Sequence, residues 1–231
     1  MWEGLPLLHF AAKFGHEFLF TLLLEKIHSD PNLVDTKDGT ITLHYATGHT
    51  KLVQILLEKY LCDSEAEGYG RSTPLCFSVS LGHMDSLHLF LKHGANIEVQ
   101  TFLGMPIHLA VHVGNIDAVR VLHAKSPGWL RHWLYGFCTP LVAAAFCDSN
   151  ECFYYLAGAA DTKAKTVFYK VICGPDSEER SLLRIKFLLD HDHELNPNLF
   201  DQEMLLEELP IICAAKRGWG TVVGELLNRT D

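Results

Sequence analysis

The chain has 231 residues, of which 48% are hydrophobic, so it can bury a packed core and is not expected to be disordered. Its 19 Lys and Arg against 28 Asp and Glu give a formal charge of −9, which disfavours nucleic acid and anionic lipid as partners. The most apolar segment, from Leu5 to Leu24, is interrupted by four polar residues, so the sequence predicts no membrane span.

One short pattern recurs along the chain. Residues 4–16 read GLPLLHFAAKFGH, residues 73–83 read TPLCFSVSLGH and residues 104–115 read GMPIHLAVHVGN, with weaker versions at 42–49, 139–148 and 209–218. The Leu-like positions Leu8, Leu43, Leu75, Ile107, Leu141 and Ile211 are spaced by 35, 32, 32, 34 and 70 residues. Because the last spacing covers two periods, we predict a degenerate unit between them, with TVFYKVIC as its first helix.

Each unit is predicted to contain two helices. The first is short and rich in small residues, and Thr73 and Thr139 stand where a side chain can cap its first turn, before a Pro at the first helical position. After a turn Gly, the second helix carries apolar residues at i, i+3 and i+4, as in Phe20, Leu23 and Leu24. A polar connector follows. Such pairs cannot bury their apolar faces alone, so they are expected to stack.

These residues resemble the ankyrin repeat, whose pattern is Thr-Pro-Leu-His-x-Ala-Ala-x-x-Gly-His followed by Val-x-x-Leu-Leu. The resemblance implies an all-α solenoid of stacked helix-turn-helix units with short connector hairpins, forming a single domain over residues 1–231. It predicts about seven repeats, at 4–36, 39–68, 70–103, 104–135, 136–165, 166–200 and 207–229.

Three segments depart from the family pattern. In the second repeat only Thr47 separates Ala46 from Gly48, so its first helix should be about half a turn short, with local strain or a kink. In the sixth repeat, residues 174–180 are predicted to form a longer polar loop. The fourth repeat runs through AKSPGWLRHWLYGFC (124–138), which places aromatic residues where a polar connector is usual.

The sequence gives little support for a catalytic or metal-binding site. His9, His44 and His108 recur at one repeat position, and the resemblance implies that they tie neighbouring connectors by hydrogen bonds; His16, His49 and His83 follow the turn Gly. The run 190–194 (DHDHE) has metal-ligating side chains but no second ligand cluster at a recognised spacing. Cys76, Cys138, Cys152 and Cys213 fall where a small buried residue would serve. No catalytic or nucleotide-binding motif is present, so no enzyme activity, metal or cofactor is expected.

The predicted binding surface has two parts. In the first helices, the two positions before the turn Gly should be exposed, and the second of them reads Phe14, Leu81, Val113, Cys147 and Arg217. This apolar stripe, taken as crossing four adjacent first helices, would suit an amphipathic helix or an extended peptide, unless it packs against a neighbouring connector. In the connectors, the candidates are Tyr69, Phe102, Trp129, Trp133 and Tyr135, since exposed aromatics are enriched at binding hot spots. Alternatively, Trp129 and Trp133 fill a gap in the stack.

Two further features are open. The acidic residues are dispersed, as expected for a solvated surface, but they would select a basic partner if they lined the groove. Asn32 and Asn196 fit the spacing of connector asparagines that are hydroxylated in some ankyrin families, although Asn is common in connectors for its turn propensity alone.

The function that the sequence favours is a non-catalytic adaptor or scaffold that binds a protein partner through the concave face and connector tips. No nucleic acid, membrane or small-molecule substrate is expected. One alternative is a substrate-recognition arm, or an effector-type host mimic, that delivers a client to an enzyme such as a ubiquitin ligase. A second is an enzyme that uses a Cys or the His/Asp cluster.

The expected location is intracellular. Seven unevenly spaced Cys and a start without secretory features predict the cytoplasm, with the nucleus as an alternative. The last repeat ends at Asn228, which suits a freestanding protein or one part of a longer chain.

Overall fold

The computed structural model describes residues 6–128, 139–147, 149–159, 165–174, 176–191 and 209–228. Over these residues the regular elements are helices, joined by turns and two isolated β-bridges. The prediction of an all-α fold is therefore confirmed for the described part of the chain. The chain divides into two compact units, Met1–Lys125 (unit 1) and Ser126–Asp231 (unit 2), and each is described by itself.

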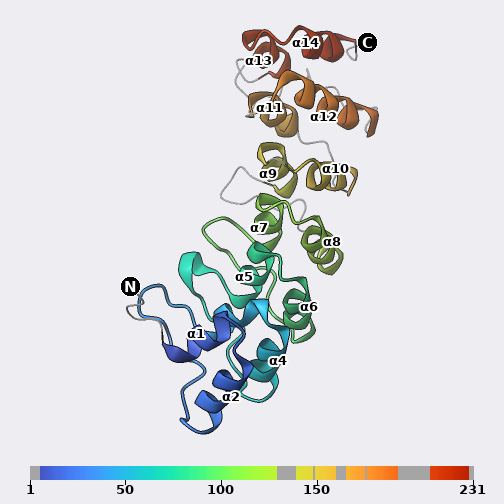
Figure 1. Ribbon diagram of the computed structural model, residues 1–231. Helices are drawn as coiled ribbons and strands as arrows, with labels where there is room; N and C mark the ends of the chain where they lie inside the picture. The colour runs from blue at the N-terminus through green and yellow to red at the C-terminus, as the bar shows by residue number, and fades with distance from the viewer. Residues whose placement is uncertain are drawn as a thin grey trace. The chain divides into compact units, whose positions relative to one another are not determined.

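Unit 1 contains four helix pairs (Figure 1). They are α1 (Leu7–Lys13) with α2 (Glu17–Glu25), α3 (Thr42–Tyr45) and the 3-10 turn η1 (Ala46–Gly48) with α4 (Thr50–Glu58), α5 (Pro74–Leu81) with α6 (Met84–Lys92), and α7 (Pro106–His112) with α8 (Ile116–Lys125). The first helices α1, α3, α5 and α7 pack successively into one row. The second helices α4, α6 and α8 form another row, and α2 packs against α1.

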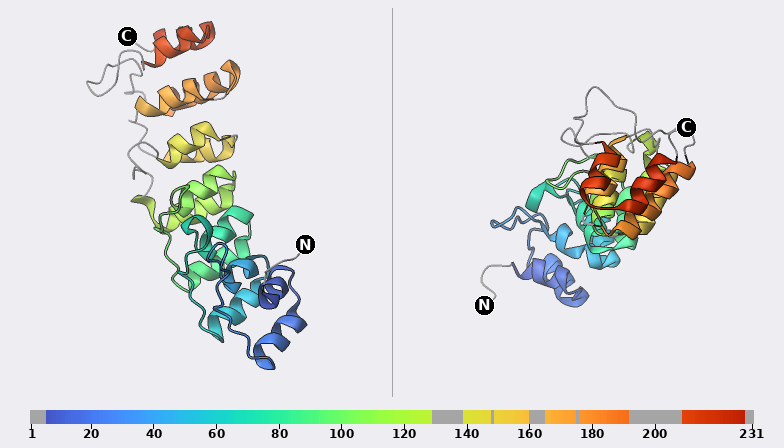
Figure 2. Two further views of the ribbon diagram at one scale, coloured as in Figure 1. Left: turned by 90° about the vertical axis from the view of Figure 1, so that its left-hand side faces the viewer. Right: turned by 90° about the horizontal axis from the view of Figure 1, so that it is seen from above.

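The described residues of unit 2 repeat the arrangement with three pairs, which lie in successive layers (Figure 2). They are α9 (Pro140–Phe146) with α10 (Asn150–Ala159), α11 (Lys165–Cys173) with α12 (Glu178–His191), and α13 (Pro210–Lys216) with α14 (Gly220–Leu227). Here α9, α11 and α13 form the row of first helices, and α10, α12 and α14 form the row of second helices. The described helices thus come in successive pairs, while the bounds of the repeats and the single domain over 1–231 remain predictions.

The core lies between the two rows of each unit. The predicted apolar positions of the second helices are buried in α2 and α4, in Phe20, Leu23, Leu24, Val53, Leu56 and Leu57. In α14 the pattern holds for Leu226 but not for Leu227, which is exposed because α14 packs mainly against α12 and α13. The periodicity therefore predicted the core side of these helices well, with its weakest fit in α14.

The predicted caps differ in outcome. Thr139 accepts a hydrogen bond from the Val142 N–H over 3.2 Å, which satisfies one of the free donors in the first turn of α9. The prediction for Thr73 is wrong, because its hydroxyl makes no cap bond and lies 3.5 Å from the sulfur of Cys76.

The turns after the first helices depend on glycine. Gly15, Gly82, Gly114 and Gly218 have φ between +67° and +74°, a region that residues with a Cβ enter at a cost. The second repeat differs, as its shortened pattern predicted. Only four residues of its first helix are α-helical, and η1 makes up the length because each 3-10 residue rises about 2.0 Å instead of 1.5 Å.

The predicted polar loop over residues 174–180 is too long. Helix α12 already begins at Glu178, and the Ser177 hydroxyl accepts the Arg180 N–H in its first turn over 3.4 Å. Glu178 and Glu179 suit this position because acidic side chains are stabilised near a helix N-terminus. Asp176 is buried under the helix rather than exposed in a loop.

Candidate functional site

The recurring histidines have structural partners. The His9 Nε2–H donates to the Leu33 carbonyl over 2.9 Å, across to the connector of its own repeat. The Nδ1 of His44 accepts the Ile41 N–H over 3.1 Å, so its proton lies on Nε2 and is donated to the Ser72 carbonyl over 3.1 Å. Burial lowers the pKa of both imidazoles below the ordinary value, which keeps them neutral. These contacts confirm the structural interpretation for His9 and His44.

The histidines after the turn glycines join successive repeats. His49 donates from Nε2 to the Lys13 carbonyl over 3.2 Å, and its ring fills the space beside Gly15, where an added Cβ would lie 2.4 Å from Cε1. The ring of His83 lies in the same way beside Gly48, 3.2 Å from an added Cβ. Gly15 is therefore needed both for the close approach of the next repeat and for its own backbone conformation, whereas Gly48 is needed for the close approach and Gly82 for the backbone.

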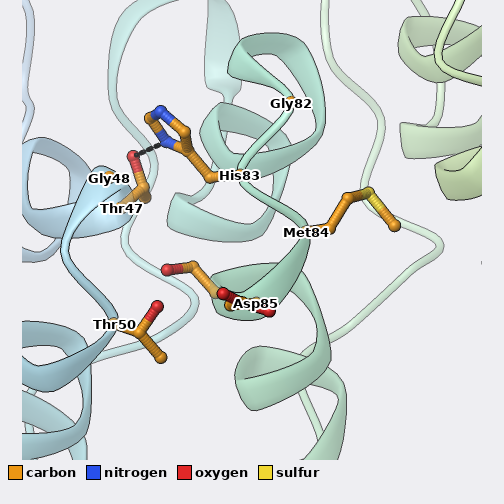
Figure 3. A pocket seen from close by; sticks show the side chains of 8 residues that line it. Thr47, Gly48, Thr50, Gly82, His83, Met84 and Asp85 are labelled. Carbon is orange, nitrogen blue, oxygen red and sulfur yellow. Dashed lines mark hydrogen bonds between the residues drawn. The ribbon is translucent and has the colours of Figure 1, made fainter.

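A pocket of about 300 Å³ lies between the turns of the second and third repeats (Figure 3). Its lining residues are Thr47, Gly48, Thr50, Gly82, His83, Met84, Asp85 and Ser86. The hydroxyl of Thr47 donates to the His44 carbonyl over 3.1 Å, so it accepts from the Nδ1–H of His83 over 3.2 Å. His83 is thus a donor to this hydroxyl and not its base, and the pair lacks the arrangement that activates a nucleophile.

The thiols are mostly interior. Cys76, Cys152 and Cys213 are buried as predicted, while Cys138 lies outside the described residues. Burial raises the pKa of Cys62 to about 11, which keeps that thiol protonated and unreactive.

The alternative of an enzyme that uses the His/Asp cluster concerns the end of α12. Asp190 and His191 close that helix, and the rest of the run, 192–194, lies outside the described residues. Within the part of the chain that the structure describes, no three His, Cys, Asp or Glu side chains gather as metal ligands would. The described helices also include none with the length and apolar character needed to cross a bilayer.

The predicted stripe is exposed but interrupted. Leu81 is the last residue of α5 and is 60% exposed. Phe14 and Val113 directly follow α1 and α7, and their side chains are also exposed. The prediction that the stripe crosses four adjacent first helices is wrong. The second repeat lies between Phe14 and Leu81, and its residue at the stripe position is Thr47. Thr47 is buried against His83. Leu81 and Val113 lie on neighbouring helices, α5 and α7, and Phe14 lies apart from them.

The connector tips carry a second apolar group. Tyr69 is 74% exposed and Phe102 is 73% exposed, and the Phe102 N–H donates to the Gly70 carbonyl over 3.0 Å, which holds the two tips side by side. Leu103 is also exposed and adds to this group. The sequence reasoning missed it, although its place beside Phe102 before a turn Gly was a usable signal.

The two groups lie at opposite ends of the same helices. The tips precede the first residues of α5 and α7, whereas Leu81 and Val113 stand at their C-terminal ends. At 1.5 Å per residue, these ends are about 10 Å apart, a distance that roughly three residues of extended peptide can span. The other predicted contact residues, Trp129, Trp133 and Tyr135, lie outside the described residues.

Comparison with known proteins agrees with this architecture. A family model described as ankyrin repeats (3 copies) matches residues 8–101, and no curated protein matches the sequence. Among solved structures, the crystal structure of the human ASB11 ankyrin repeat domain superposes with a TM-score of 0.77 at 22% sequence identity, covering 98% of this chain and 99% of that one. Ankyrin repeats are generally protein-interaction modules. Residues 8–101 therefore match the ankyrin-repeat family by sequence, and the chain has the fold of an ankyrin-repeat domain over nearly its whole length.

Proposed function

We propose that this protein is a non-catalytic adaptor or scaffold that binds a protein partner through the first helices and connector tips of unit 1. The observation that carries the proposal is the paired exposure of Tyr69 and Phe102 on adjoining tips. An exposed aromatic ring keeps apolar surface in contact with water, which is unfavourable until a partner covers it, and aromatic anchors supply much of the energy of protein interfaces.

The arrangement supports one continuous contact. A partner segment that covers Tyr69 and Phe102 can run along α5 and α7 to Leu81 and Val113, because these helices are only about 10 Å long and join the connectors directly to those residues. The backbone bond between the tips fixes the spacing of the two rings before any partner arrives, which lowers the ordering cost of binding. Trp129, Trp133 and Tyr135, which belong to unit 2 and lie outside the described residues, stay a separate proposal that rests on their sequence pattern.

The test is affinity capture from a cell lysate, read by mass spectrometry, with the wild type and a Tyr69→Ser/Phe102→Ser variant side by side. Phe18→Ser is the matched control, because Phe18 is an aromatic residue 84% exposed on α2, outside the proposed surface. A protein retained by the wild type and the control but lost from the folded double variant supports the proposal.

The affinity of the captured partner should then fall at least about tenfold in the double variant, since hot-spot rings each contribute about 2 kcal/mol. Equal capture by all three proteins would refute the role of the tips. A Trp129→Ala/Trp133→Ala variant extends the test: lost capture with unchanged stability supports a surface role, and a large fall in melting temperature shows that the two rings are packed.

A further inference from the structure

Charge is divided between the two rows of unit 2. The first helices α9, α11 and α13 contain no Asp or Glu, although the chain has 28 of them. Their charged residues are lysines, Lys165, Lys170 and Lys216, and Arg217 follows directly after α13. The acidic residues on the described helices of unit 2 all lie in the second row, in Glu151, Glu178, Glu179, Asp190 and Glu225.

The cations of the second row form ion pairs with carboxylates. Lys186 lies 3.7 Å from Glu225, and Arg180 and Arg184 both pair with Asp176, at 3.1 Å and 2.5 Å. The acidic net charge of the chain is therefore not spread evenly over this unit. On the described helices of unit 2, the first row thus forms a cationic face, even though the protein as a whole is acidic.

The cationic face also offers apolar surface. The Nζ of Lys170 lies 5.4 Å from the ring centres of both Phe146 and Tyr169, so two aromatic rings flank the ammonium group. Phe146 is 43% exposed, and Tyr169 and Lys170 are half-buried. This juxtaposition holds a positive charge beside ring faces, which limits its motion without removing it from solvent.

The next helix of the row supplies a second charged position. The guanidinium of Arg217 lies 4.0 Å from the ring centre of Trp219 and donates to the Gly174 carbonyl over 2.8 Å, which fixes it against the end of α11. Arg217 and Lys216 are exposed. Since α11 packs against α13 and Arg217 donates to the Ile172 and Gly174 carbonyls, Arg217 lies at the end of α11 that follows Lys170.

We propose that the first-helix row of unit 2 binds an acidic protein segment, one in which Asp or Glu alternates with apolar residues. The carboxylates face Lys170, Lys216 and Arg217, and the apolar side chains cover Phe146 and Tyr169. A long polyanion such as nucleic acid fits less well, because the remaining surface of a chain with net charge −9 repels it. This site is separate from the surface of unit 1, so either proposal can fail alone.

The test uses the full chain and fluorescence anisotropy. The probe is a fluorescein-labelled peptide in which Glu alternates with Leu and Phe, compared with peptides that carry Gln or Lys in place of Glu. The wild type should bind the Glu peptide, bind the Gln peptide at least about tenfold more weakly, and lose affinity as salt rises toward 1 M, where the screening length falls to about 3 Å.

The matched variants are Lys170→Gln and Lys186→Gln, which remove the same charge from the first and the second row. Lys170→Gln should weaken binding of the Glu peptide about threefold, and Lys170→Gln/Lys216→Gln about tenfold, since an exposed ion pair contributes up to about 1 kcal/mol. Lys186→Gln should leave the affinity within about twofold, because its charge lies on the other row.

Four results would overturn the inference. They are no measurable binding of the Glu peptide, equal binding of the Glu and Gln peptides, an equal effect of Lys170→Gln and Lys186→Gln, or tighter binding of a single-stranded oligonucleotide than of the Glu peptide. Circular dichroism of each variant verifies that the helices are intact, so that a loss of binding reports on the surface.

Discussion

Arg184 connects two repeats of unit 2 from a fully buried position. Its guanidinium donates to the Asp176 carboxylate over 2.5 Å, to the Ala145 carbonyl over 3.0 Å and to the Asn150 side chain over 3.0 Å. It also lies 4.8 Å from the ring centre of Phe153. The side chain thus joins α12 to both helices of the preceding repeat.

Arg184→Ala should lower the free energy of unfolding by about 3 kcal/mol. Removing one partner of a buried ion pair costs about 3 to 5 kcal/mol, because the other charge stays in a poorly solvated place. The lower end applies because Arg180, which is half-buried, still lies 3.1 Å from the Asp176 carboxylate. Urea unfolding followed by circular dichroism measures the change.

Arg180→Ala is the matched control, since it removes a more exposed cation from the same carboxylate and should cost no more than about 1 kcal/mol. Arg184→Lys should recover only part of the loss, because one ammonium group cannot reproduce the planar set of donors. A loss below about 1 kcal/mol for Arg184→Ala, or equal losses for the two alanine variants, would refute the reasoning.

Three further predictions test the turns, the buried histidines and the thiols of the described residues. Gly82→Ala and Gly15→Ala both place a Cβ at positive φ, which costs about 1 to 2 kcal/mol, but only the Cβ of Gly15→Ala meets the His49 ring, at 2.4 Å. Thermal unfolding should therefore show that Gly15→Ala loses at least about 1 kcal/mol more stability than Gly82→Ala. Equal losses would show that the ring moves aside. Because burial lowers the pKa of His44, the unfolded state binds more protons than the folded state between that lowered pKa and the ordinary value of about 6.5. The free energy of unfolding should therefore fall as the pH drops through this window, and His44→Gln should flatten this pH dependence. An unchanged slope would assign the pH dependence to other groups. Iodoacetamide should modify the exposed Cys173 at least about tenfold faster than the buried Cys62, whose pKa is raised to about 11. Peptide mass spectrometry measures both rates of modification, and equal rates in the folded protein would contradict the burial of Cys62.

The candidate surface could be predicted in part. Positions such as Leu81 and Val113 were expected to be exposed because they fall on the side of a first helix opposite its small residues, and they are. The continuity of the stripe could not be predicted, because it depends on Thr47, which the shortened second repeat turns inward toward His83.

The repeat period, the helix pairs, the turn glycines and the buried side of most second helices could all be predicted from the amino-acid sequence. These follow from local properties, the spacing of apolar residues and the backbone freedom of glycine, which act within one repeat. The packing of the repeats was needed to show that Arg184 is buried and that Thr73 does not cap α5. The physical reason is that the environment of a polar side chain is set by neighbours from other repeats, and these are fixed only when the repeats pack.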